Sequence, residues 1–253
     1  MYELLATIRA RVSGTQLPRS RFVSSNATRF VNGETLVERV GRLDPDVIAT
    51  VEAAPYFLWP DGIRPAATAP SRSPMAVVVD FHSHRELWWP RRDYRPVAPP
   101  SGARFGRSQF VGHTILTQAT ALSPDRLDID EQEDLLRQAL DGIIDACIRH
   151  EPADMMWTRW FERARSALDD GGSGKRIDWV DSLFPASLYT ARARRVLASA
   201  ADASDVFGGM GSWIDWSVCQ DFDYGPFTGR LGTAVDRALA AAANHGLLPG
   251  ATL

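Results

Sequence analysis

The sequence is poor in cysteine and has no long apolar run near its start. Its 253 residues include 2 cysteines, Cys147 and Cys219, and neither belongs to a Cys-x-x-Cys pattern. So few cysteines exclude a disulfide framework and indicate a reducing compartment. Charged side chains interrupt residues 1–12, so we expect neither a signal peptide nor a membrane span there. These absences predict a cytoplasmic protein without a membrane partner.

A strong positive charge is missing as well. The net charge is −3, and all but one of the 28 basic residues are arginine, a bias that indicates a GC-rich genome. This near-neutral balance argues against a surface that follows phosphates, so we expect no nucleic-acid partner. The charge is unevenly spread: residues 1–125 carry 15 basic against 11 acidic residues, a net +4, and the remainder carries 13 against 20, a net −7. The two halves therefore differ in character.

Turn and cap residues indicate mixed structure in the N-terminal half. The Asn-Gly pair at 32–33 supplies two residues that accept positive φ, so it predicts a hairpin between strands at 28–31 and 34–40. Asp44 and Pro45 are the residue types preferred at a helix cap and first turn. A helix is therefore expected from Asp44 to residue 54.

The rest of this half alternates strands with proline-rich loops. A continuous apolar run at Met75–Phe81 suits a central strand buried on both faces. Segments rich in Pro, Ser and Gly at 65–74 and 90–107 predict surface loops. The further elements expected here are a helix over 1–12, a strand, turn and strand over 56–63, and a strand over 109–116.

From about residue 130 onward, apolar residues recur at helical spacing. Such stripes predict helices whose apolar faces pack together. Met156 is expected to face inward, and Tyr-Gly-Pro at 224–226 is expected to form a turn. The predicted helices span residues 130–148, 152–168, 177–184, 188–200 and 231–243. The expected fold class is α+β, with a mixed α/β region and a small sheet over residues 1–122 and a helical region over residues 123–253.

Three glycines in four positions form the most unusual stretch of the C-terminal half. Glycine tolerates positive φ and close approach of another backbone, so this stretch predicts a tight, buried turn. It is either a loop that offers backbone N–H groups to an anion or a packed elbow. The absence of a preceding strand and of a Gly-Lys-Ser/Thr sequence favours the elbow. As a binding loop it would comprise Gly208, Gly209, Met210, Gly211, Ser212 and Asp215.

Residues 207–215 read Phe-Gly-Gly-Met-Gly-Ser-Trp-Ile-Asp and follow two amphipathic helices with a tryptophan-rich face at 156–160. This combination resembles a family of small, mostly helical bacterial domains with the signature Phe-Gly-Gly-Met-Gly-Ser-x-Asn-Asp, over about residues 130–245. That family has no established activity, so the resemblance implies a helical bacterial domain of the kind found beside toxin and conflict genes. Ile214 stands where the signature has Asn, so any capping or ligand-binding role of that Asn is lost here.

The end of the apolar run at 75–81 carries the sequence Asp80-x-His82-x-His84. Alternate residues of a strand project on one face, so His82 and His84 can present two imidazoles to one divalent ion, most naturally zinc. His-Ser-His after an apolar strand resembles the JAMM family of zinc isopeptidases, and Asp-x-His-x-His resembles the first metal motif of amidohydrolase-like barrels. Arg95 stands where the JAMM pattern has an Asp, and the nearest carboxylate is Asp93. The competing interpretation is a strand end whose histidines form local hydrogen bonds.

Basic and aromatic residues interleave at Trp88, Trp89, Arg91, Arg92 and Tyr94. Such a stretch can stack bases and neutralise phosphate. It can also be a proline-bounded loop whose tryptophans pack on the body, or a patch that anchors a protein partner, because Trp, Tyr and Arg dominate binding hot spots. The packed loop is favoured first and the protein partner second.

An acidic set, Asp215, Asp221 and Asp223, surrounds aromatic residues near the glycine stretch. It can bind a cation or a basic partner, and an ordinary solvated loop is the favoured alternative.

The residues required for catalysis do not form a complete set. Cys147 lies on an apolar helix stripe, where the pKa of a thiol rises, and Ser212 is not in a Gly-x-Ser-x-Gly elbow. We therefore predict a non-catalytic cytoplasmic bacterial protein that binds a protein partner and is immunity-like or conflict-associated. Two alternatives stay open: a metal-dependent hydrolase, JAMM-like or amidohydrolase-like, with zinc at His82 and His84, and a structural component of a phage-like assembly.

Overall fold

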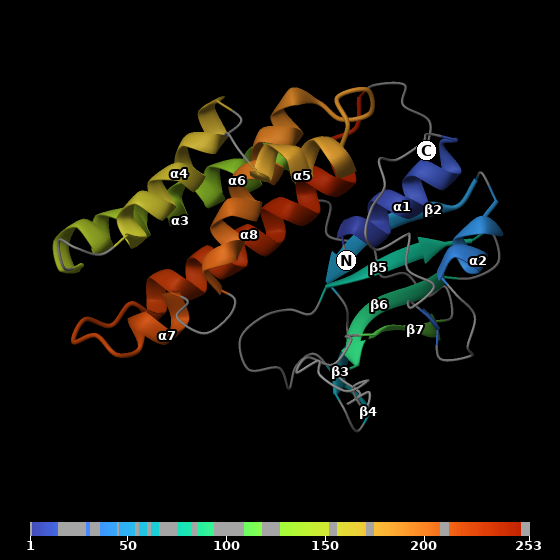
Figure 1. The fold of residues 1–253 in the computed structure, drawn as a ribbon, viewed down its shortest axis with the longest axis horizontal. Helices are drawn as coiled ribbons and strands as arrows, with labels where there is room; N and C mark the ends of the chain where they lie inside the picture. Colours follow the sequence, from blue (N-terminus) through green and yellow to red (C-terminus); the bar gives the residue numbers. More distant parts are fainter. Residues whose placement is uncertain are drawn as a thin grey trace, which may run out of the picture. The chain divides into compact units, whose positions relative to one another are not determined.

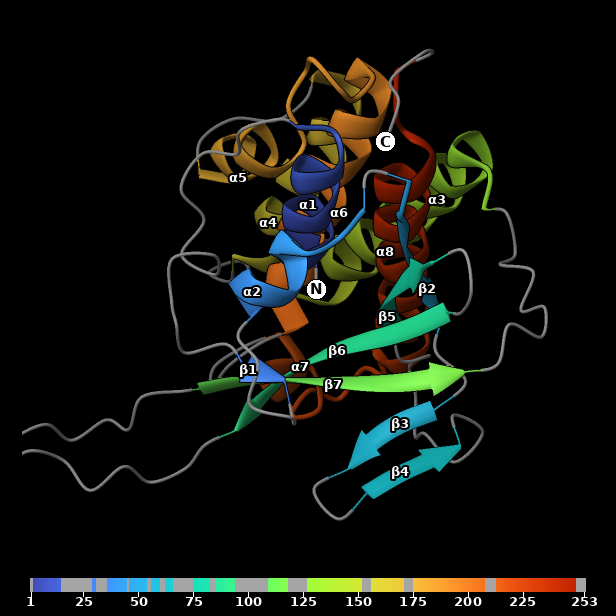
Figure 2. The same cartoon turned by 90° about the vertical axis from the view of Figure 1, so that its right-hand side faces the viewer.

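The computed structural model of the chain divides into two compact units (Figures 1 and 2). Apart from a few connecting residues, the first unit ends at Pro124 and the second begins at Asp125. Strands belong to the first unit and long helices to the second, so the predicted α+β class is confirmed. The described residues are 2–14, 29–30, 36–44, 46–53, 56–59, 62–65, 75–81, 85–93, 109–117, 127–151, 156–170, 175–207 and 213–248. Within these ranges, no helix is long and apolar enough to cross a membrane.

A five-stranded sheet organises the first unit. Its strands, in spatial order, are β1 (Arg29–Phe30), β7 (Gln109–Thr117), β6 (Arg85–Asp93), β5 (Met75–Asp80) and β2 (Ile48–Ala53). Neighbouring strands are antiparallel except β1 and β7, which are parallel. Val77, Val78 and Val79 of β5 are all buried, which confirms a central strand covered on both faces. β7 confirms the strand predicted at 109–116.

Helix α1 (Tyr2–Val12) packs against β2 and confirms the predicted N-terminal helix. Leu5 and Ile8 have no exposed surface. Arg9 is also buried, and its Nε and Nη2 donate to the carbonyl of Ala49 at 3.1 and 2.9 Å. A buried guanidinium needs such acceptors, so Arg9 joins the helix to the sheet.

A separate two-stranded hairpin confirms the two strands predicted over 56–63. It consists of β3 (Tyr56–Trp59) and β4 (Gly62–Pro65), which pair antiparallel with Trp59 opposite Gly62. Pro60 and Asp61, between the strands, lie outside the described residues.

Two predictions for the first unit are wrong. The predicted hairpin strand at 34–40 is instead occupied by helix α2 (Leu36–Gly41), while Asn32 and Gly33 lie outside the described residues. The helix predicted from Asp44 to residue 54 is instead strand β2, preceded by a turn in which Val47 N donates to Asp44 O. β2 is rich in β-branched residues and pairs with β5 along its full length. This pairing outweighs the local cap signal.

Six helices form the described part of the second unit. Helix α3 packs against α4 and α8, and α6 packs against the same two helices. Asp128 caps α3 by accepting from the backbone N–H groups of Asp130 and Glu131. The helices are α3 (Ile129–His150), α4 (Trp157–Asp170), α5 (Lys175–Leu183), α6 (Ala191–Ser204), α7 (Trp213–Ser217) and α8 (Gly225–His245). The five helices predicted from apolar stripes are thus confirmed, and α7 is additional.

Three local predictions for this unit are wrong. Residues 224–226 are the start of α8 rather than a separate turn, because Pro226 suits the first turn of a helix. Met156 precedes α4 and is 53% exposed instead of facing inward. Ile148, at the end of the predicted apolar stripe of α3, is 64% exposed.

A buried ion pair holds α2 on the sheet of the first unit. Arg39 on α2 donates through Nη2 to both carboxylate oxygens of Glu86 on β6, at 2.8 and 2.7 Å. The indole N–H of Trp88 donates to the same carboxylate at 2.6 Å, and the Arg39 guanidinium lies 5.4 Å from the centre of that indole. Glu86 thus satisfies two donors that would be costly to bury alone.

We expect Glu86→Leu to lower the free energy of unfolding of the first unit by about 2 to 4 kcal/mol, because Arg39 and Trp88 lose their shared acceptor. Hydrogen exchange of the β5–β7 amides, followed with urea, measures the change. Adding Arg39→Met to that variant removes the charge left behind and should recover part of the loss. A single variant as stable as the wild type would contradict this role.

Candidate functional site

The predicted glycine loop is described only at its margins. Gly208 to Ser212 lie outside the described residues, and Asp215 is exposed on α7. Val206 before the loop and Trp213 after it are both buried, at 1% and 0% exposure. The loop therefore connects two residues of the core, and its anion-binding role stays a prediction.

The predicted metal ligands are likewise untested. His82 and His84 lie outside the described residues, and Asp93 is the last residue of β6. Asp80 ends β5 in register with Arg85. The described part of the chain contains no group of three His, Cys, Asp or Glu residues placed to hold a metal. Zinc at His82 and His84 remains a prediction.

Trp88 cannot belong to an exposed partner patch, which corrects one prediction. It has no exposed surface, and its indole N–H is bonded to Glu86. Trp89, Arg91 and Arg92 lie on strand β6, in register with β7, rather than in a proline-bounded loop. Tyr94 lies outside the described residues. The burial of Trp88 agrees with the interpretation in which the tryptophans pack on the body, although Trp88 does so from a strand rather than from a loop.

A cluster of aromatic rings closes one end of the helical unit, and Trp213 of α7 is at its centre. Trp213 has no exposed surface, and its indole N–H donates to Thr228 Oγ1 of α8 at 2.8 Å. Its ring makes edge or tilted contacts with centroid separations of 4.9 to 5.8 Å, the range of favourable aromatic pairs. The rings around it are Trp157, Phe161, Trp216 and Tyr224.

Contacts join the end of α3 to the start of α4 beside this aromatic cluster. The Glu151 carboxylate accepts from the backbone N–H groups of Trp157 and Thr158 at 2.7 and 2.9 Å. His150, the last residue of α3, stacks on Phe222 with ring centroids 3.8 Å apart. A cap and a ring stack therefore hold the end of α3 against the start of α4 and the segment before α8.

Exposed apolar side chains gather at the same end of the unit. Six large apolar residues are exposed in the described part of the chain, and four of them lie within two residues of a ring that packs at this end of the unit. Two, Ile48 and Leu135, lie elsewhere. The four are Ile148 at 64%, Met156 at 53%, Ile214 at 42% and Val218 at 76% exposure. We refer to these four residues as the apolar end.

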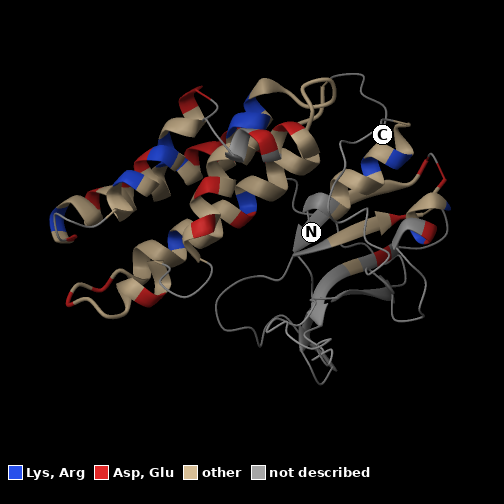
Figure 3. Ribbon diagram, viewed as in Figure 1, with Lys and Arg blue, Asp and Glu red and all other residues tan. Residues whose placement is uncertain are grey.

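Acidic residues accompany the apolar end (Figure 3). Asp215, Asp221 and Asp223 are all exposed. Residues 213–229, from α7 into the first turns of α8, contain these three aspartates and no Lys or Arg. The sequence groups these acids with aromatic residues, as the structure does. Its apolar spacing, however, predicts inward-facing positions for Ile148 and Met156.

Two ionisable groups beneath the apolar end, Cys147 and Tyr224, are kept in their neutral forms. Burial, with a smaller contribution from the charge of Glu151, raises the pKa of the Cys147 thiol to about 12. Burial likewise raises the pKa of the Tyr224 hydroxyl to about 12. A thiol in this state is a poor nucleophile. The expectation that Cys147 is not catalytic is therefore supported.

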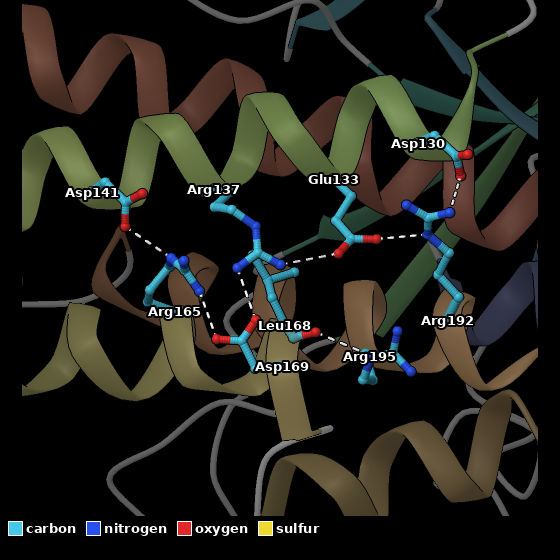
Figure 4. A network of polar contacts seen from close by, with 9 residues as sticks. All are labelled: Asp130, Glu133, Arg137, Asp141, Arg165, Leu168, Asp169, Arg192 and Arg195. Carbon is cyan, nitrogen blue, oxygen red and sulfur yellow. Dashed lines mark hydrogen bonds and ion pairs between the residues drawn. The ribbon is translucent and has the colours of Figure 1, made fainter.

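A network of ion pairs runs along α3, α4 and α6 (Figure 4). Arg137 donates to Glu133 at 3.1 Å and to Asp169 at 2.8 Å. Arg165 donates to Asp169 at 2.9 Å and to Asp141 at 2.8 Å. Because these five charged groups bond to one another, the role of the network is to align the helices.

Comparison with known proteins assigns no family or function to this chain. No family model, curated protein or solved structure matches this chain. The resemblance at residues 207–215 therefore stays a prediction, and the functional argument depends on the surface described above.

Cys219 should react with a thiol reagent such as Ellman's reagent in the folded protein at pH 8, whereas Cys147 should not. Cys219 is exposed and Cys147 is buried with a raised pKa. Absorbance should report one thiol before urea is added and the second only after unfolding. Cys219→Ser identifies the fast thiol, and rapid labelling of that variant would contradict the burial of Cys147.

Asp169→Asn should lower the thermal midpoint slightly near pH 7 and have a smaller effect near pH 3. Hydrogen bonds from Arg137 and then Arg165 lower the pKa of Asp169 from its ordinary value. Such a group contributes stability above its unfolded pKa and loses the contribution as pH falls through the folded pKa. The control is Asp134→Asn on α3. An equal effect of Asp169→Asn at both pH values would contradict an electrostatic cause.

Proposed function

We propose that this chain is a non-catalytic binding protein whose apolar end contacts a protein partner. The observation that carries the proposal is the grouping of Ile148, Met156, Ile214 and Val218 around one end of a helical unit. Scattered apolar side chains are ordinary on a protein surface, whereas a group of them at one place is typical of an interaction site.

The surroundings of the apolar end support binding rather than chemistry. The aromatic cluster beneath it is tightly packed, and Trp213 at its centre is completely buried. A rigid base lowers the entropic cost of binding, because few side chains must become ordered on contact. The partly exposed rings of Trp216 and Phe222 belong to a residue class that is enriched at binding hot spots.

The class of binding protein follows from the sequence pattern at residues 207–215. Its resemblance to helical bacterial domains found beside toxin and conflict genes favours a cytoplasmic, immunity-like or conflict-associated protein. Residues 213–215, at the end of this pattern, begin α7 and include Ile214 of the apolar end. The pattern and the proposed contact surface thus share a helix.

The double variant Ile148→Ser/Val218→Ser should weaken the complex with the natural partner by roughly tenfold for each side chain, because burial of each contributes about 1.5 kcal/mol. The partner is identified by cross-linking to the wild-type protein and purified, and affinity is measured by calorimetry. Leu135→Ser is the matched control, since Leu135 is an exposed apolar residue on α3 away from the apolar end.

Equal weakening by Leu135→Ser, or unchanged affinity of the double variant, would contradict the assigned surface. The non-catalytic role has its own test. Elemental analysis that found a stoichiometric metal, lost on changing His82 and His84 to Ala, would favour a metal-dependent hydrolase instead.

A further inference from the structure

We propose that the segment bound at the apolar end is basic and amphipathic, with aliphatic residues on one face and Lys or Arg beside them. This inference rests on the proposed protein-binding function and specifies the chemistry of the partner. It is carried by the charges that accompany the exposed apolar residues.

Apolar and acidic residues alternate along α7 and the segment that follows it. Ile214 precedes Asp215, and Val218 lies between Asp215 and Asp221, all of them exposed. No Lys or Arg occurs from residue 213 to residue 229. A partner that covers Val218 must therefore come close to carboxylates, and complementary charge favours a basic segment over a neutral or acidic one.

Two of the basic residues near this end can be placed from the contacts of their helices, and a third, Arg230, is exposed on α8. Arg149 at the end of α3 forms an ion pair with Asp145, one turn earlier. Arg159 on α4 is two positions from the buried Phe161, and a helix turns by about 200° over two residues. Since Phe161 contacts Trp213 of α7, Arg159 lies on the side of α4 opposite α7.

Helix N-termini at this end do not provide a site for anions. The N-terminus of α4 is already capped by the Glu151 carboxylate, which accepts from Trp157 N and Thr158 N. The Asp223 carboxylate accepts from Gly225 N at the start of α8 at 2.9 Å. Helix N-termini attract anions when their N–H groups are unpaired. With carboxylates at both, phosphate-bearing partners such as nucleic acids and anionic membranes are disfavoured.

Two synthetic helical peptides test the inference directly. Both carry leucine on one face, and the other face carries lysine in one peptide and glutamate in the second. In fluorescence anisotropy with the full chain, the lysine peptide should bind about tenfold or more tightly than the glutamate peptide, as expected for charge-selected interfaces. Its affinity should fall as salt is raised, because exposed charges are screened.

Neutralising the acids should remove this preference. Asp215→Asn/Asp221→Asn/Asp223→Asn should reduce the ratio of the two affinities to roughly threefold or less. The carbonyl oxygen of the side-chain amide introduced in place of the Asp223 carboxylate can still accept from Gly225 N, and circular dichroism verifies the fold. Asp221→Asn alone is a milder variant and should lower the ratio of the two affinities partly. The matched control removes three exposed acids elsewhere on the unit, Glu131→Gln/Asp134→Asn/Asp178→Asn, and should leave the ratio unchanged.

Each contrary result overturns the inference. For the peptides, these results are failure of the lysine peptide to bind, equal binding of both peptides, or an equal change in the affinity ratio caused by the control triple variant. For vesicles, the contrary result is that the protein binds phosphatidylserine vesicles and that Ile148→Ser/Val218→Ser abolishes this binding. If both peptides bind alike and Ile148→Ser/Val218→Ser weakens both, only the basic character is wrong. The protein-binding function itself fails only if that double variant also leaves the natural partner's affinity unchanged.

Discussion

The burial of Trp213 is the interaction on which the proposed binding surface depends. Its ring contacts Trp157 and Phe161 of α4 and Tyr224 before α8, and its N–H donates to Thr228. A five-residue helix such as α7 has no stability of its own. Packing of this one side chain therefore positions α7 and, with it, the exposed residues that α7 carries.

This arrangement separates the rings from the aliphatic side chains at the end of the unit. The large aromatic residues bury most of their area against one another, while Ile214 and Val218 remain on the outside. The neutral Cys147 and Tyr224 beneath them add no charge to the interior. A hydrophobic surface over a packed aromatic base is suited to contact with another chain, and the aspartates beside it give that contact a preferred charge.

The sequence predicted the helical unit well because its apolar stripes are long and their partners are neighbouring helices. The prediction failed at positions where pairing between strands or the end of a helix determines the structure. β2 is a strand because β5 pairs with all of it, and Trp88 lies on a strand rather than in a loop because β6 pairs with both β5 and β7. Ile148 directly follows the buried Ala146 and Cys147 but is itself exposed, and the apolar spacing of the sequence does not mark that difference. The acidic set could be predicted, whereas the exposure of Ile148 and Met156 could not.

The ion pairs between α3 and α4 have a further consequence for how this surface meets a partner. Arg137 and Asp141 are one turn apart on α3, and their partners Asp169 and Arg165 are one turn apart on α4. Sliding either helix by a turn would break both bridges at once, so the two pairs favour one longitudinal register of α3 and α4. Each exposed pair contributes at most about 1 kcal/mol, and together they oppose a shift of Ile148 relative to the start of α4 when a second chain binds.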